Sequence, residues 1–196
     1  TQEFDSARHY EVFRTRALAN NGAMGLEGVG KMNRRMLESR AGWPETSLYL
    51  YVMRGTLTQL LYRYGELYAH NPAEKLMFRL SLQDKARHLA YGMAHIKYTV
   101  EHKGPDFATG LLRVTGTVER DMAAEMDDPV LWEALAIIFG GSIDNIQQGM
   151  KIVHSLQQRY IREYLKRSQY CGIDKTEDNL GLELAKYLRL EEPSEA

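Results

Sequence analysis

The sequence contains little cysteine, and this scarcity limits the kinds of protein it can encode. Cys171 is the single cysteine among 196 residues, so no internal disulfide framework can form. Such cysteine usage suits a reducing compartment, and we expect a cytoplasmic protein. No histidine or acidic pattern surrounds Cys171, which we therefore interpret as a bystander rather than a nucleophile.

The net charge is small, and the chain has few long apolar runs. The formal net charge is −1 and basic residues are dispersed among acidic ones, so we expect no nucleic-acid partner. The longest apolar run, from Val130 to Ile138, is broken by Glu133 and is too short to span a bilayer. Residues 1–5 contain neither a basic nor an apolar stretch typical of a signal peptide. We expect no membrane partner.

What the chain does contain is enough apolar sequence for one substantial core. With 44% apolar and 26% charged residues, its composition is that of an ordinary globular domain. We predict a single domain over residues 1–190 and a frayed polar tail over residues 191–196.

Apolar residues recur at helical spacing, and no segment alternates with a period of two. The sequence therefore predicts an all-α fold. The predicted helices cover residues 2–19, 31–40, 45–69, 73–103, 106–126, 129–140, 142–167 and 180–190. Asp128 and Pro129 are typical of a helix start, and Gly140-Gly141 of an interruption. In the helix predicted over residues 142–167, the apolar residues at helical spacing, beginning with Ile143, are expected to face inward.

Glycine marks two further features of the pattern. Residues 25–30 have the order Gly-x-x-Gly-x-Gly, but no strand precedes them and no Lys-Ser/Thr follows. We interpret them as a linker rather than a phosphate loop. Gly55, inside a predicted long helix, indicates close packing or a local bulge.

The main chemical signal is a repeated five-residue pattern, Asp-x-Ala-Arg-His. It occurs at residues 5–9 with Ser6 at the variable position and at residues 84–88 with Lys85 there. In a helix, positions i, i+3 and i+4 share a face. Two such faces meeting inside a bundle would form a polar site in an apolar core.

The two segments resemble the Asp-Glu-x-Arg-His segments of ferritin-like di-iron carboxylate proteins. That superfamily includes bacterial multicomponent monooxygenases, N-oxygenases and the small subunits of ribonucleotide reductase. The resemblance covers residues 1–103 and implies a ferritin-like helical bundle in which four helices supply a Glu, a Glu-x-x-His, a Glu and a second Glu-x-x-His to two metals. It also implies that the first helices of the bundle precede Thr1.

By this resemblance the metal-binding histidines fall on His9 and His88, whereas the glutamate ligands fall on other residue types. Ser6 and Lys85 stand at two glutamate positions, and Val52 or its neighbour Tyr51 stands at a third. The residues that the resemblance places around the ligands, where they orient the imidazole rings, are Asp5, Arg8, Asp84 and Arg87.

The missing carboxylates disfavour a normal di-iron centre on charge grounds, because two iron ions need several anionic oxygens. Lys85 would instead occupy the place of a cation, paired with Asp5, with Asp84 or with a Glu outside this chain. The arrangement resembles that of metal-free ribonucleotide reductase subunits, in which uncharged residues and a Lys replace the metal ligands. We therefore expect no cofactor, the alternative being iron or manganese held by His9, His88, Asp5 and Asp84.

Other residues extend these expectations. His95 and His102 follow His88 at intervals of seven, and we expect both to be partly exposed as the helix face drifts outward. Tyr51 could be a redox residue, although core packing with a hydroxyl partner is the commoner role of such a tyrosine. Thr56 matches a threonine that lines the active site in the monooxygenase branch.

Three functions fit these features. The first is a non-catalytic scaffold subunit that pairs with itself or with a related ferritin-like subunit, which would cover the apolar face of its first helix. The second is an O₂-dependent oxidoreductase with an unusual mononuclear or metal-free site, in which Lys85, Tyr51 and Thr56 would be catalytic. The third is a module that binds a small apolar ligand in a pocket lined by Val52, Gly55 and Thr56.

Overall fold

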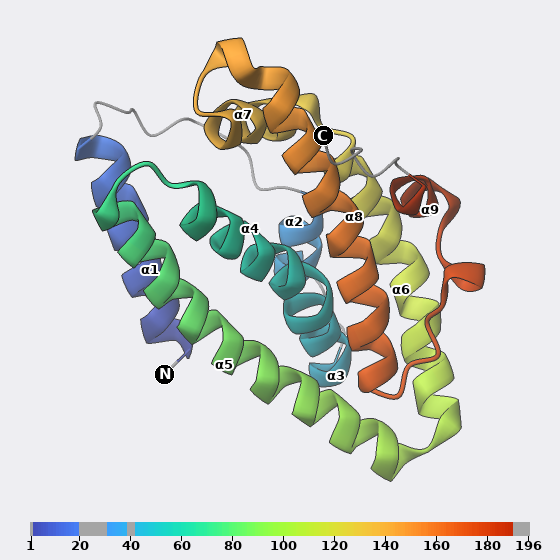
Figure 1. Ribbon diagram of the computed structural model, residues 1–196. Coiled ribbons are helices and arrows are strands. Elements are labelled where there is room, and N and C mark those ends of the chain that lie inside the picture. The colour runs from blue at the N-terminus through green and yellow to red at the C-terminus, as the bar shows by residue number, and fades with distance from the viewer. Residues whose placement is uncertain (1, 20–30, 39–41, 190–196) are drawn as a thin grey trace.

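The computed structural model describes residues 2–19, 31–38 and 42–189, and none of these residues lies in a strand. The all-α prediction is confirmed. The helices are α1 (Gln2–Ala19), α2 (Lys31–Glu38), α3 (Trp43–Ser47), η1 (Leu48–Met53), α4 (Arg54–Tyr68), α5 (Pro72–Lys103), α6 (Pro105–Met126), α7 (Pro129–Gly140), η2 (Ile143–Asn145), α8 (Ile146–Tyr170), η3 (Glu177–Asn179) and α9 (Leu182–Leu188) (Figure 1). The predicted linker at residues 25–30 and the predicted tail at residues 191–196 lie outside the described residues.

Local side-chain chemistry explains where several helices begin and end. The side chain of Asn71 accepts a hydrogen bond from the backbone N–H of Glu74 and starts α5, and that of Asp128 accepts one from Val130 and starts α7. Gly141 has a φ of +80°, a left-handed conformation that suits glycine and ends α7. The predicted start at Asp128 and the break after Gly140 are both confirmed.

The predicted helix over residues 45–69 contains one turn of π-helix, η1, near its start. Its last bond is donated by the N–H of Arg54 to the carbonyl oxygen of Tyr49, five residues earlier. A Cβ at Gly55 would lie 2.8 Å from the carbonyl oxygen of Leu50 and 3.1 Å from Leu89 Cδ1 of α5. Close packing is therefore present at Gly55, and a bulge, predicted as the alternative, lies just before it in η1.

The hydrophobic core surrounds α8, which packs against α4, α7 and α9. Leu156, Tyr160, Ile161 and Tyr164 of α8 are at most 1% exposed. Ile143, which the pattern places inward, is instead 68% exposed because it lies in η2, outside the register of α8. Its predicted inward position is wrong.

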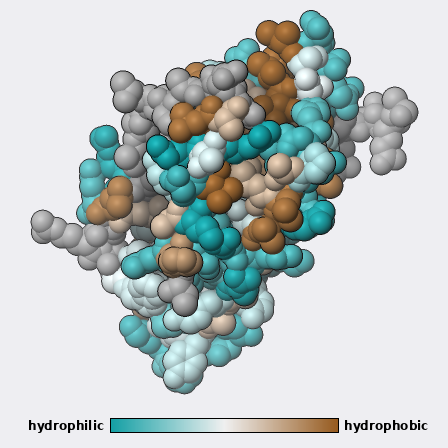
Figure 2. Space-filling model, turned by 90° about the vertical axis from the view of Figure 1, so that its left-hand side faces the viewer, coloured by the Kyte–Doolittle hydropathy of each residue, from teal (hydrophilic) through white to brown (hydrophobic). Residues whose placement is uncertain are grey.

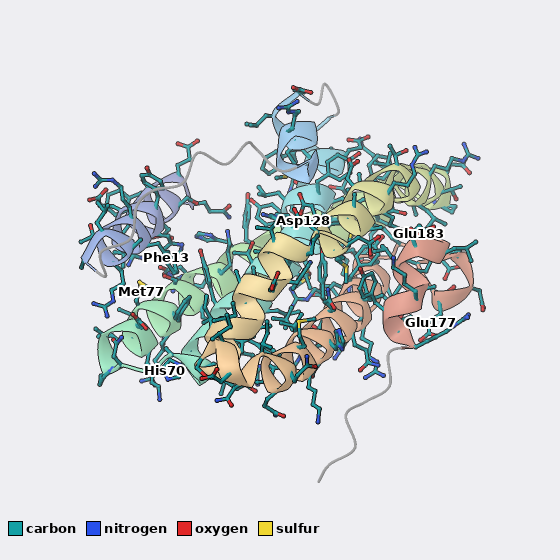
Figure 3. All side chains as sticks on the ribbon, turned by 90° about the horizontal axis from the view of Figure 1, so that it is seen from above. Phe13, His70, Met77, Asp128, Glu177 and Glu183 are labelled. Atoms are coloured by element: carbon teal, nitrogen blue, oxygen red, sulfur yellow. The ribbon has the colours of Figure 1, made fainter. Side chains whose placement is uncertain are left out.

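α1 lies at the edge of the bundle along α5 (Figure 1), and His9 is its one buried residue. Phe13 packs at 5.3 Å from the ring of Tyr62 and 5.4 Å from that of Phe78, and Figure 3 shows it between α1 and α5. Phe4 and Tyr10 are 73% and 62% exposed. Figure 2 shows this side of the molecule as a largely hydrophilic surface with separate hydrophobic patches. Polar contacts must therefore supply much of the attachment of α1.

The segment after α8 is attached by a buried ion pair that the sequence pattern did not predict. Lys175 Nζ lies 2.7 Å from Glu119 Oε1 of α6, and the two side chains are each 3% exposed. Glu119 also accepts hydrogen bonds from the Tyr164 hydroxyl and the Gly181 N–H. This network holds residues 175–181 against α6 and α8.

Among the described residues, no single helix is both long and apolar enough to cross a membrane. Only α7 together with the segment Ile143–Tyr170 passes that test, as a pair bent by 103°.

Cys171 is fully buried, and burial raises the pKa of its thiol to about 12. Because the thiolate is the reactive form, we expect a disulfide reagent at pH 8 to leave the folded protein unmodified and to label it once denatured. Absorbance of the released thiol measures this reaction. Labelling of the folded protein as fast as that of the denatured chain would contradict the buried position.

Candidate functional site

The two copies of the repeated motif face each other across α1 and α5, and each histidine binds the aspartate of the other copy. His9 Nε2 lies 3.0 Å from Asp84 Oδ2, and His88 Nε2 lies 2.9 Å from Asp5 Oδ2. The pairing is reciprocal because the two helices run antiparallel, so the first residue of one motif meets the last residue of the other. The motifs thus meet, but at the edge of the bundle and not inside its apolar core.

Two arginines complete this arrangement, which we call the motif lock and define as residues Asp5, Arg8 and His9 of α1 with Asp84, Arg87 and His88 of α5. Arg8 donates to Asp84 and, at 3.4 Å, to Asp5. Arg87 donates to the second oxygen of Asp84. Two carboxylates thus face two guanidinium groups.

Hydrogen bonding lowers the pKa of both carboxyl groups in the lock. The bond from His88 is the main cause of the lowered pKa of Asp5. Burial by itself raises the pKa of Asp84, but the bonds from His9, Arg87 and Arg8 outweigh burial and leave this pKa below its ordinary value. Both groups are therefore bound as anions.

This electrostatic pattern predicts that acid weakens the fold. A carboxyl group whose pKa is lower in the folded state stabilises the protein above its unfolded-state pKa of about 4, and that contribution disappears as the pH falls through the folded-state value. We expect the unfolding temperature to fall between pH 5 and pH 2, with a smaller fall in the Asp5→Asn variant. Thermal unfolding followed by circular dichroism measures the unfolding temperature at each pH. An equal fall in the original protein and in the Asp5→Asn variant would contradict a stabilising role of the Asp5 carboxylate.

The residues at the glutamate positions of the resemblance lie in different surroundings, although Ser6 and Tyr51 line a common cavity, described below. Ser6 is exposed on α1, whereas Val52 is fully buried in the core. Lys85 has no hydrogen bond or ion pair with the part of the chain that the structure describes, and burial, with a smaller effect of Arg54, lowers the pKa of its ammonium group. The proposed pairing of Lys85 with Asp5 or Asp84 is wrong, because His9, His88 and the two arginines already occupy those carboxylates.

Thr56 and Tyr51 lie in different surroundings. The hydroxyl of Thr56 donates to the carbonyl oxygen of Val52 at 2.6 Å and accepts from Arg167 of α8 at 3.0 Å. Tyr51 is 4% exposed and its hydroxyl donates to Gln2 Oε1 at 2.6 Å. Tyr51 is thus a core tyrosine with a hydroxyl partner, and a Cβ at Gly92 would lie only 2.1 Å from its ring.

The donor set does not fit a di-iron centre. Within residues 2–19, 31–38 and 42–189, no three His, Cys, Asp or Glu side chains are placed so that they could hold a metal ion. The Nε2 atoms of His9 and His88 are bound to carboxylates, whose oxygens also serve the arginines. A metal at these residues would have to break the motif lock.

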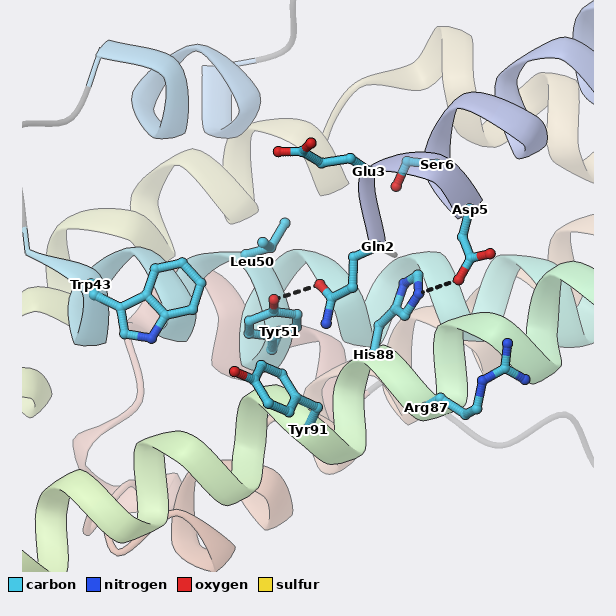
Figure 4. Close-up of a pocket in the computed structure, with 10 residues that line it drawn as sticks. All are labelled: Gln2, Glu3, Asp5, Ser6, Trp43, Leu50, Tyr51, Arg87, His88 and Tyr91. Atoms are coloured by element: carbon cyan, nitrogen blue, oxygen red, sulfur yellow. Dashed lines mark hydrogen bonds and ion pairs between the residues drawn. The ribbon is translucent and has the colours of Figure 1, made fainter.

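A cavity of about 1120 Å³ opens beside the lock, between α1, α3, η1 and α5 (Figure 4). Its lining combines aromatic rings with polar groups: Gln2, Glu3, Asp5, Ser6, Trp43, Leu50, Tyr51, Arg87, His88 and Tyr91. Val52, Gly55 and Thr56, which were expected to line a pocket, do not line this one.

The sequence analysis did not predict several of the residues that line the cavity, because they lie outside the repeated motif. Tyr91 could have been found, since it follows His88 by three residues and so shares its side of α5. Gln2, Glu3 and Trp43 carried no comparable signal. His95 is half-buried, with its ring 5.8 Å from that of Trp43, and His102 is exposed, so the predicted outward drift of these histidines is confirmed.

Comparison of the chain with protein-family models, with curated proteins and with solved structures found no match.

Proposed function

We propose that this chain is a non-catalytic helical subunit of the ferritin-like type, in which the motif lock fastens α1 to α5 in place of a metal centre. The observation that supports this function best is the reciprocal pairing of His9 with Asp84 and of His88 with Asp5. In this arrangement the imidazole and carboxylate groups that could bind metal bind each other.

The surroundings of the lock support the same function. Ser6 and Val52 offer no carboxylate, and Lys85 forms no ion pair with Asp5 or Asp84 of the lock. Each carboxylate of the lock faces a guanidinium group, and Asp84 is 5% exposed, as expected for a structural polar cluster.

The surface of α1 indicates how such a subunit would act. Phe4, Tyr10, Val12 and Leu18 are each more than 40% exposed on a helix that buries a single residue. A second copy or a related ferritin-like subunit would cover these side chains, and the lock would hold α1 in place to receive it.

Metal analysis tests the proposal. The protein is expressed with iron and manganese supplied, and bound metal is measured per chain after purification. We expect far less than one equivalent and no O₂ uptake. Near-stoichiometric metal, or O₂ consumption with or without metal, would overturn the proposal in favour of the O₂-dependent oxidoreductase with Tyr51 beside its cavity.

A gain-of-metal variant sharpens this test. Ser6→Glu with Lys85→Glu restores carboxylates at two positions that the resemblance assigns to ligands, so metal retention should rise above that of the original protein. The matched control is Ala7→Glu with Ala86→Glu, which adds carboxylates at two neighbouring exposed positions. Equal retention by both double variants would contradict the assignment of those positions.

A further inference from the structure

The cavity beside the motif lock has an aromatic end. Trp43 of α3, Tyr51 of η1 and Tyr91 of α5 line it, and Trp43 and Tyr91 are 49% and 59% exposed. His95 lies near both exposed rings, 5.8 Å from the Trp43 ring and 6.4 Å from the Tyr91 ring. Exposed aromatic rings held against a neighbour offer preformed π-faces to a ligand.

The charges of the cavity are unevenly matched. Asp5 is bound to His88 and Arg8, and Arg87 is bound to Asp84, so these charges belong to the motif lock. The Glu3 carboxylate has no ion pair or hydrogen bond with the residues that the structure describes. Figure 4 shows Glu3 reaching from α1 toward the side of Trp43 and Leu50, with Arg87 at the opposite end.

We infer that this cavity binds an organic cation with an apolar body, its positive nitrogen beside Glu3 and the face of Trp43. An ammonium group is attracted to the negative face of an aromatic ring and to an unpaired carboxylate. The volume of about 1120 Å³ suits a drug-sized molecule, whose apolar part would lie against Leu50 and Tyr51. Such binding does not depend on the absence of metal and goes beyond the scaffold function.

Benzyltrimethylammonium is a suitable probe, with the neutral isostere in which carbon replaces nitrogen as its comparison. Isothermal titration of the whole protein measures both. We expect saturable binding of the cation and about tenfold weaker binding of the neutral compound, the ratio expected from one cation–π contact and one carboxylate. Tryptophan fluorescence gives a second readout. Of the two tryptophans, Trp132 is buried at 4% exposure, so a ligand in the cavity should change the emission of the exposed Trp43.

Two variants locate the site. Glu3→Gln should reduce the preference for the cation over the neutral isostere, and Trp43→Leu should weaken binding of the cation by about tenfold. Glu11→Gln removes a carboxylate elsewhere on α1 and should leave binding unchanged. Glu3 and Trp43 are both exposed, so circular dichroism should report an intact fold in the two variants.

Equal affinity for the two probes would show an apolar cavity without cation selectivity and would overturn the inference. Absence of saturable binding in the original protein would also overturn it, as would a preference unaffected by Glu3→Gln.

Discussion

Replacing Asp84 by Asn is expected to lower the free energy of unfolding by about 2–3 kcal/mol. Asp84 accepts bonds from His9, Arg8 and Arg87 while only 5% exposed. The two arginines are partly exposed and can turn to water, but His9 is buried and would have as its acceptor only one neutral amide oxygen, which the arginines also approach. The cost therefore comes mainly from His9 and from the loss of the anion.

Asp84→Asn should also destabilise α1 more than the other helices. α1 buries only His9, so without Asp84 it should open locally, and hydrogen exchange at residues 2–19 should become faster than exchange in α8. Urea unfolding and hydrogen exchange measure the two effects. Asp144→Asn, at an exposed position in η2, is the control, and an Asp84→Asn variant within about 0.5 kcal/mol of the original would contradict the structural role of the lock.

Replacing Glu119 by Gln is expected to cost more, about 3–5 kcal/mol. The amide keeps the shape of the side chain but removes the negative charge, which leaves the Lys175 ammonium buried with neutral acceptors, such as the Asn179 carbonyl oxygen, and without its counter-ion. A buried charge without its counter-ion is among the most destabilising single changes.

Two further variants separate the effect of the unpaired Lys175 charge on stability from the effect of altered packing. Glu101→Gln breaks an exposed pair with Lys97 at 3.9 Å and should change stability by less than about 0.5 kcal/mol. Glu119→Leu with Lys175→Met removes both charges and should cost less than Glu119→Gln alone. Urea unfolding measures all of them. A double variant less stable than Glu119→Gln would show that the unpaired Lys175 charge is not the main cause of the destabilisation.

Much of the fold could be predicted because its signals are local. The side chains of Asn71 and Asp128 start helices through bonds two or three residues away, and Gly141 ends one through its own φ. Ile143 shows the limit of such patterns. One short 3₁₀ turn before α8 was enough to turn its side chain to solvent.

The candidate site could be predicted only in part, because its geometry depends on how two helices align. The repeat indicated that the two motifs would meet, but no pattern within either motif shows that Asp5 binds His88 and Asp84 binds His9. The environment of Lys85 depends on its burial and on Arg54 of another helix. Glu119 and Lys175 likewise meet through the packing of distant segments and leave no local pattern.

A double-mutant cycle tests the central claim, the reciprocal pairing of the motifs, most directly. The free energies of unfolding of His9→Gln, Asp84→Asn and the double variant give the coupling between these residues. The same cycle for His9 and Asp5, which belong to one motif and do not bind each other, is the reference. The motif lock predicts a coupling of about 0.5–3 kcal/mol for His9 with Asp84 and a smaller one for His9 with Asp5. Equal coupling in the two cycles, or none for His9 with Asp84, would contradict it.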